Sequence, residues 1–107
     1  MIVKASSAKE KVVDPMKIKE YDINSNFSGA LVEINGAHGK MKNKKEDRVY
    51  FILEGNGTFV IDGKEEEVSQ NDLVFISKNT PYDIKGKMKY FMLCSPEFDA
   101  KDDVMLK

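Results

Sequence analysis

From residue 27 onward, the apolar residues of the chain fall in short stretches that are separated by Gly, Asn, Asp and Pro. None of these stretches keeps the 3.6-residue period of an amphipathic helix, and each is about four to eight residues long, as strands are. Short apolar or alternating runs bounded by turn residues are typical of antiparallel strands. The pattern therefore predicts an all-β domain with strands at residues 27–34, 48–53, 58–61, 65–68, 73–76 and 87–94.

Turn signals separate these strands. The Gly-Asn-Gly sequence at 55–57 supplies positive φ angles at little steric cost, so it predicts a tight hairpin. Further turns are expected at 62–64, 69–72 and 80–81, so that strands recur about every ten residues, as in a sandwich or barrel. The acidic run 65–67 is expected on an exposed edge strand, where charge discourages pairing between molecules.

The chain has room for one domain, because a chain of 107 residues cannot hold two separate cores. Residues 1–26 are expected to form an extended arm with one or two edge strands, since Pro15 interrupts them and only 16–19 alternates cleanly. Residues 27–95 are expected to form the barrel. Residues 96–107 are expected to form a C-terminal tail that packs back on the barrel.

Composition and charge narrow the classes of partner. Hydrophobic residues make up 41% and charged residues 33% of the chain, which is ordinary for a globular domain. The net charge of −1 gives no field that would recruit nucleic acid or an anionic membrane, so neither is an expected partner. We expect a cytoplasmic protein, because no apolar run is long enough for a signal peptide or a membrane helix.

The single cysteine, Cys94, cannot form an intramolecular disulfide, which fits a reducing compartment. It lies in the apolar run 90–94, so it is interpreted as a buried packing thiol rather than a nucleophile.

The segments 49–57, 59–63 and 71–76 resemble the conserved double-stranded β-helix of the cupin superfamily. This resemblance implies a jelly-roll barrel. The spacing of the first cupin motif, a glycine, a His-x-His pair, a glutamate and a second glycine, is met here by Gly36, Lys42, Lys44, Arg48 and Gly55. The last histidine of the second motif falls on Tyr82.

The resemblance also implies that the usual metal site has been lost. The four positions that bind iron, manganese, nickel or zinc in many cupins correspond here to Lys42, Lys44, Arg48 and Tyr82. A loop alignment shifted by one residue replaces the two lysines by Met41 and Asn43. Neither set is a good set of metal ligands, and the only histidine of the chain is His38, so no metal or other cofactor is expected.

Arg48 is the only arginine in a chain with 17 basic residues, and it lies in an otherwise apolar and aromatic strand. Since side chains alternate along a strand, an inward-facing Arg48 would place Tyr50 inside the barrel as well. We expect Arg48 to face the interior within reach of Tyr82. Its guanidinium must then be paired, either with a ligand or with an internal acid such as Asp83, and the sequence leaves both open.

The leading interpretation is a metal-independent small-molecule-binding cupin whose ligand is a small anionic or polyhydroxylated metabolite. Its candidate ligand-binding residues are Arg48, Tyr50, Tyr82, Lys42 and Lys44. One alternative is an enzyme resembling sugar isomerases or epimerases, in which Tyr82 with His38 or Lys44 would be the acid/base pair. Another is a structural or regulatory dimer module with no ligand. A homodimer is expected, because a partner can cover the edge strands and arm that a barrel this small leaves exposed.

Overall fold

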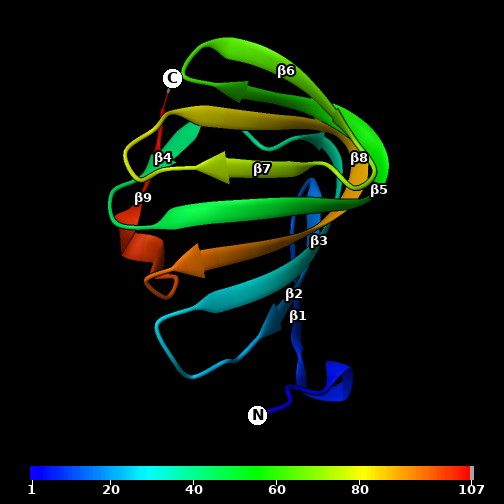
Figure 1. Ribbon diagram of the computed structural model, residues 1–107, viewed down its shortest axis with the longest axis vertical. Coiled ribbons are helices and arrows are strands. Elements are labelled where there is room, and N and C mark those ends of the chain that lie inside the picture. Colours follow the sequence, from blue (N-terminus) through cyan, green and yellow to red (C-terminus); the bar gives the residue numbers. More distant parts are fainter. Residues whose placement is uncertain (107) are drawn as a thin grey trace.

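The strands form one antiparallel sheet that curls into a barrel (Figure 1), in a computed structural model that describes residues 1–106. Within these residues the strands are β1 (Lys9–Val13), β2 (Met16–Tyr21), β3 (Ser28–Ala37), β4 (Met41–Asn43), β5 (Asp47–Ile61), β6 (Lys64–Ser69), β7 (Leu73–Ile76), β8 (Tyr82–Ser95) and β9 (Asp103–Met105). Two 3₁₀ turns, η1 and η2, span Ala5–Ser7 and Ala100–Asp102. The predicted all-β class is confirmed. Within the described part of the chain, no helix has the length and apolar character needed to cross a membrane.

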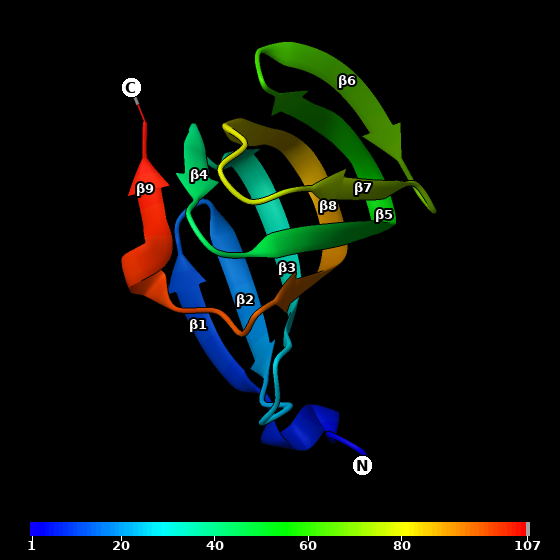
Figure 2. The same ribbon diagram turned by 60° about the vertical axis from the view of Figure 1, so that its left-hand side comes forward.

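The long strands β5 and β8 pair with each other and form the centre of the sheet. The other edge of β8 pairs with β3, which continues through β2 to β1. The other edge of β5 pairs with β7 along residues 48–51 and with β6 along residues 56–61. Figure 2 shows β1 and β2 as one wall of the barrel beside β3, and the segment after β8 crossing to β9, which pairs with β4. Functional side chains on β5 and β8 are therefore held by strands on both sides.

The prediction of a tight hairpin at 55–57 is wrong. Strand β5 continues through these residues from Asp47 to Ile61, with one shift in its pairing register between Ile52 and Glu54. The glycines serve a close approach between strands instead. Gly55 has φ +80°, and a Cβ placed there would lie 2.3 Å from the carbonyl oxygen of Lys87 on β8. Glycine is favoured both in turns, where φ is positive, and where two strands pass too closely for a side chain. The sequence pattern therefore could not distinguish a turn from a close strand contact.

Two outer parts of the sheet are β6 and the hairpin of β1 and β2. β6 carries the acidic run 65–67, pairs only with β5 among the described residues and is exposed along most of its length, which confirms the expected edge strand. In the N-terminal region, β1 and β2 form a hairpin that lies beside β3. The alternation at 16–19 had indicated only part of the second of these strands.

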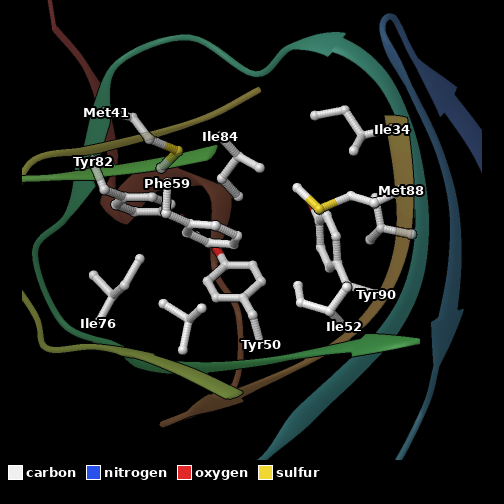
Figure 3. Packing of buried hydrophobic residues seen from close by; sticks show 12 residues of the cluster. Ile34, Met41, Tyr50, Ile52, Phe59, Ile76, Tyr82, Ile84, Met88 and Tyr90 are labelled. Carbon is white, nitrogen blue, oxygen red and sulfur yellow. The ribbon is translucent and has the colours of Figure 1, made fainter. Parts of the chain in front are cut away.

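The interior is packed with large side chains that face inward from β3, β4, β5, β7 and β8 (Figure 3). The buried apolar cluster consists of Val32, Ile34, Met41, Tyr50, Ile52, Phe59, Val74, Ile76, Tyr82, Ile84, Met88 and Tyr90. Three of the largest of these are tyrosines, and a buried phenol oxygen requires a hydrogen-bond partner. The hydroxyl of Tyr90 bonds to the sulfur of Met16, whereas the partners of the Tyr50 and Tyr82 hydroxyls identify the polar part of the barrel.

Candidate functional site

Arg48, Tyr50 and Tyr82 meet inside the barrel, as the sequence predicted. Arg48 and Tyr50 are alternate residues of β5, and Tyr82 begins β8. The Nη1 group of Arg48 donates a hydrogen bond of 2.7 Å to the hydroxyl of Tyr82, and the hydroxyls of Tyr82 and Tyr50 lie 2.6 Å apart. All three side chains are buried, with Arg48 only 4% exposed. The predicted inward orientation of Arg48 and its contact with Tyr82 are confirmed.

The charge of Arg48 is balanced by two acids of the protein itself. Its Nε donates to Oε1 of Glu46 at 3.1 Å, and its Nη2 lies 3.0 Å from the same oxygen. Nη2 also donates to Oδ1 of Asp103 at 2.9 Å. Glu46 is 1% exposed, so this carboxylate and the guanidinium are buried together. One guanidinium facing two carboxylates leaves no unbalanced positive charge for a ligand.

The prediction that Asp83 is the internal acid paired with Arg48 is wrong. Its Oδ1 accepts hydrogen bonds from the backbone amides of Gly39 and Ile84. Asp83 follows the inward-facing Tyr82 on β8, so strand alternation turns its side chain to the other face.

Asn43 supports the two acids from β4. Its Nδ2 donates to Oδ1 of Asp103 at 2.8 Å and lies 3.3 Å from Oε2 of Glu46. Its Oδ1 accepts from the backbone amides of Lys45 and Glu46, at 2.9 and 2.7 Å. A buried amide that uses both of its ends in this way fixes the loop between β4 and β5 and positions the Glu46 carboxylate.

Lys42 and Lys44 do not line the interior, contrary to the proposed ligand-binding role. Met41 and Asn43 are the buried residues of β4, while Lys42 is half-buried on the other face and Lys44 is exposed. The alignment shifted by one residue is therefore the one that the barrel follows. Because the side-chain period of a strand is two, an error of one residue in the loop moved both predicted positions to the outside.

His38 lies beside Tyr82, although it comes from the turn between β3 and β4. The two rings are stacked, with centroids 6.0 Å apart and an angle of 22° between their planes. Nδ1 of His38 lies 3.0 Å from the carbonyl oxygen of Gly39, and because a carbonyl only accepts, Nδ1 carries the hydrogen. In the neutral imidazole, Nε2 is then the nitrogen that can accept a proton.

A cavity of about 320 Å³ lies above this group, between β1, β2 and β3 on one side and β5 and β8 on the other. Its polar floor includes Arg48 and Tyr50, and His38 lies on its wall. At its rim, Nζ of Lys11 lies 3.2 Å from Oε1 of Glu20. The apolar part of its lining consists of Val13, Met16, Ile18, Ala30, Val32, Met41, Met92, Phe98 and Met105.

A more open groove of about 530 Å³ lies elsewhere, lined by residues that include Lys17, Glu33, Glu54 and Lys87. All four of these side chains are at least partly exposed, and the buried polar network does not reach this groove. The barrel cavity is therefore the stronger candidate, because it combines an apolar lining with a few convergent polar groups.

Burial keeps the phenols of Tyr50 and Tyr82 in their neutral form. Burial raises the pKa of Tyr50, and the neighbouring Tyr82 raises it further. Burial also raises the pKa of Tyr82, although the Arg48 guanidinium opposes the rise. Two neutral phenols carry two O–H hydrogens, and the contact between them uses one. The pair therefore has a second O–H hydrogen, and of the two residues Tyr50 is the one that lines the cavity.

Cys94 is buried at the cavity wall, where burial raises the pKa of its thiol to about 12. A thiol in this state is neutral at physiological pH and is a poor nucleophile. The interpretation of Cys94 as a buried packing residue is confirmed.

The residues at the family's metal-binding positions do not fit a metal ion. They are Met41, Asn43, Arg48 and Tyr82, and the guanidinium at their centre would repel a cation. Among residues 1–106, no group of three or more His, Cys, Asp or Glu side chains is arranged to hold a metal.

Comparison with known proteins agrees with the fold. A family model described as a cupin domain matches residues 31–93. An uncharacterized protein of Methanocaldococcus jannaschii, MJ1618, is 26% identical over 89 residues, which cover 79% of this chain and 71% of that protein.

Among solved structures, the Streptomyces protein PAC13, described as a nucleoside dehydratase, superposes with a TM-score of 0.92 at 16% identity. The superposition with its Tyr→Phe variant, solved with uridine, covers 100% of this chain and 90% of that one. KdgF from Halomonas sp. superposes with a TM-score of 0.82 at 13% identity, over 94% and 97% of the two chains. At these identities the structural likeness shows the fold, and it confirms the predicted jelly-roll barrel.

Proposed function

The chain belongs to the cupin domain family, and we propose that its barrel is a metal-independent pocket for a neutral, polyhydroxylated small molecule. The observation that carries the proposal is the hydrogen-bonded group of Arg48, Tyr50 and Tyr82, of which Arg48 and Tyr50 form the floor of the cavity and Tyr82 lies behind them. Tyr50 is buried, and its hydroxyl group offers a phenol hydrogen that a sugar hydroxyl in the cavity could accept.

The charges around the cavity favour the polyhydroxylated ligand over the anionic one. Arg48 is already paired with Glu46 and Asp103, and at the rim Lys11 is paired with Glu20. An anion at the floor would face the two carboxylates at close range. A neutral ligand meets no such repulsion and can use the free phenol hydrogen.

A nucleoside fits both halves of this lining. Its ribose hydroxyls match the polar floor, and its flat base matches a wall that includes Met16, Met92 and Phe98. Methionine sulfur and aromatic rings make favourable contacts with such a ring. The structures of PAC13 with uridine support this choice of ligand class.

Calorimetric titration with uridine tests the proposal, with uridine 5′-monophosphate as the anionic counterpart. We expect uridine to bind and its monophosphate to bind more weakly. Tyr50→Phe should weaken uridine binding roughly tenfold, because it removes one hydrogen bond from the phenol pair. Tyr21→Phe is the matched control, since Tyr21 lies against Phe91 and outside the cavity lining. Tighter binding of the monophosphate, or equal effects of the two substitutions, would contradict the proposal.

A second candidate function is acid/base catalysis on a bound sugar, and the contact between His38 and Tyr82 favours it. Nε2 of His38 can remove a proton from a carbon beside a carbonyl group. The phenols can donate a hydrogen bond to the oxygen on which negative charge develops. Return of the proton to the opposite face of the same carbon completes an epimerisation. Return of the proton to the neighbouring carbon, with transfer of the hydroxyl proton to the former carbonyl oxygen, completes an isomerisation, and neither reaction needs another reactant. Lys44, the other base suggested from the sequence, is exposed and does not line the cavity.

Exchange of carbon-bound hydrogen with solvent measures this activity directly. If this function holds, tag-free protein in D₂O should exchange the hydrogen beside the carbonyl of D-ribose or D-ribulose, followed by NMR. His38→Gln should slow the exchange by roughly 10²- to 10⁴-fold, the usual contribution of a general base. No exchange above the uncatalysed rate with either sugar would exclude this candidate for pentoses and leave the binding function.

A further inference from the structure

The two acids that pair with Arg48 differ in their access to the cavity. Asp103 lines the cavity and its side chain is 28% exposed, whereas Glu46 is 1% exposed and is not part of the lining. Both oxygens of Glu46 are used within the protein. Oε1 accepts from Arg48, and Oε2 contacts Nδ2 of Asn43 and the backbone amide of Asp99. Asp103 is therefore the acid of this pair that a ligand can reach.

The two carboxylate oxygens of Asp103 have different surroundings. Oδ1 accepts hydrogen bonds from Nη2 of Arg48 at 2.9 Å and from Nδ2 of Asn43 at 2.8 Å. Oδ2 accepts no hydrogen bond from residues 1–106, and it is not enclosed, because every buried side-chain oxygen in that part of the chain has a partner. An ionised carboxylate only accepts hydrogen bonds. Asp103 therefore has one oxygen available to a hydroxyl group in the cavity.

The backbone of β9 fixes the position of Asp103 independently of its charge. Asp103 lies opposite Asn43 in the pairing of β9 with β4, and Figure 2 shows these two strands side by side. Two further backbone hydrogen bonds tie the segment to the neighbouring chain, from the amide of Lys44 to the carbonyl of Asp102 and from the amide of Leu106 to the carbonyl of Lys40. A neutral side chain of the same shape at position 103 should therefore stay in the same place.

We propose that Asp103 determines the ligand class of the cavity, by accepting a hydrogen bond from a ligand hydroxyl and by excluding an anionic group. This inference rests on the proposed function, because it concerns the same cavity. A ligand hydroxyl can donate to Oδ2 of Asp103, and a hydroxyl can also accept from the phenol of Tyr50. A phosphate dianion has no hydrogen to donate to Oδ2 and is repelled by its charge. Such a residue discriminates both by favouring one ligand and by disfavouring the other.

Asp103→Asn should reverse this preference with little change in shape. Arg48 and Asn43 both donate to position 103, so the amide oxygen should keep these contacts and the Nδ2 group should then take the place of Oδ2. A negatively charged acceptor thus becomes a neutral donor. Arg48 keeps its buried ion pair with Glu46, so the guanidinium is still balanced.

The single arginine of the chain provides the readout, because its Nε–H group gives one arginine side-chain signal in a ¹⁵N NMR spectrum. The protein is titrated at pH 8 with uridine, uridine 5′-monophosphate and inorganic phosphate. In the wild type, we expect uridine to move the Arg48 signal and millimolar phosphate to leave it in place. This arm of the experiment needs no substitution.

In Asp103→Asn, the affinity for uridine should fall roughly tenfold and the affinity for the monophosphate should rise. The ratio of the two dissociation constants should therefore change by at least about thirtyfold, and phosphate should now move the Arg48 signal. Glu97→Gln is the matched control. It removes one negative charge from an exposed position of the same C-terminal segment, outside the cavity lining, so it should leave the ratio unchanged.

The phosphate titration separates this inference from the proposed function. Failure of uridine to bind the wild type would contradict the proposed function, while a phosphate response confined to Asp103→Asn would still support the exclusion of anions by Asp103. Equal phosphate responses in the wild type and Asp103→Asn, no response in either, or the same change of ratio in Glu97→Gln would overturn the inference. If circular dichroism shows Asp103→Asn unfolded, Asp103→Ser, which also removes the charge, decides between these outcomes.

Discussion

Replacing Arg48 with methionine should destabilise the protein by about 3–5 kcal/mol, because it leaves the carboxylates of Glu46 and Asp103 without their counter-charge. Glu46 is 1% exposed, so water cannot replace the guanidinium there. Methionine keeps much of the side-chain volume, so the expected loss comes from the uncompensated charge rather than from a cavity. Urea denaturation of the variant and the wild type measures the difference.

Removing the charge on the other side provides the control for this prediction. The double variant Arg48→Met with Glu46→Gln should recover part of the lost stability, because no full charge is then left buried at Glu46. Asp103→Asn alone should cost less than Arg48→Met, since the Asp103 side chain is 28% exposed and water screens its pair. A loss below about 1 kcal/mol for Arg48→Met would mean that the pair contributes no more than a surface ion pair.

Replacing Gly86 with alanine should cost about 3–5 kcal/mol, because two long strands pass each other there without room for a side chain. Gly86 of β8 lies opposite Gly57 of β5. A Cβ on Gly86 would lie 2.6 Å from Cα of Gly57 and 2.8 Å from the carbonyl oxygen of Asn56. Both neighbours are backbone atoms in the centre of the sheet, so neither can move without disturbing the β5–β8 pairing. The φ angle of +138° adds strain for any residue other than glycine.

Gly63 is the matched control for the close approach at Gly86. It also has a positive φ, +81°, but a Cβ placed there would have no atom within 4 Å. Gly63→Ala should therefore cost only the backbone term of about 1 kcal/mol. Thermal unfolding should show a drop of roughly 4–8 °C for this variant and a drop several times larger for Gly86→Ala. Equal drops would contradict the role of Gly86 in the strand crossing.

The part of the site that could be predicted from the sequence is the part set by strand alternation. A period of two places Arg48 and Tyr50 on one face of a strand, and the cupin resemblance brought Tyr82 to the same place. Each of these inferences uses spacing within one or two continuous segments. The convergence of the three side chains followed from that spacing.

The rest of the site depends on the alignment of one loop and on contacts between segments that are far apart in the sequence. The loop before β5 could be aligned in two ways, and the choice that put Lys42 and Lys44 inside reversed the two faces of β4. Asp103 is separated from Arg48 by 55 residues of chain and reaches it only because β9 pairs with β4. No local pattern in a charged tail could indicate this contact.

His38 shows a similar limit, since its contact with Tyr82 depends on the shape of the turn after β3. The glycines at 55 and 57 show that a residue type can report a backbone requirement without reporting its cause. Their pattern predicts a turn, whereas both glycines lie where β8 passes close to β5.

The most direct test of the central claim is a crystal structure of chelator-treated protein grown with uridine. The proposed function predicts uridine in the barrel cavity, with a ribose oxygen within hydrogen-bond distance of the hydroxyl of Tyr50 or Tyr82 and no metal between Arg48 and His38. Uridine bound only outside the cavity, an empty cavity at saturating uridine, or a metal retained among Met41, Asn43 and Tyr82 would contradict it.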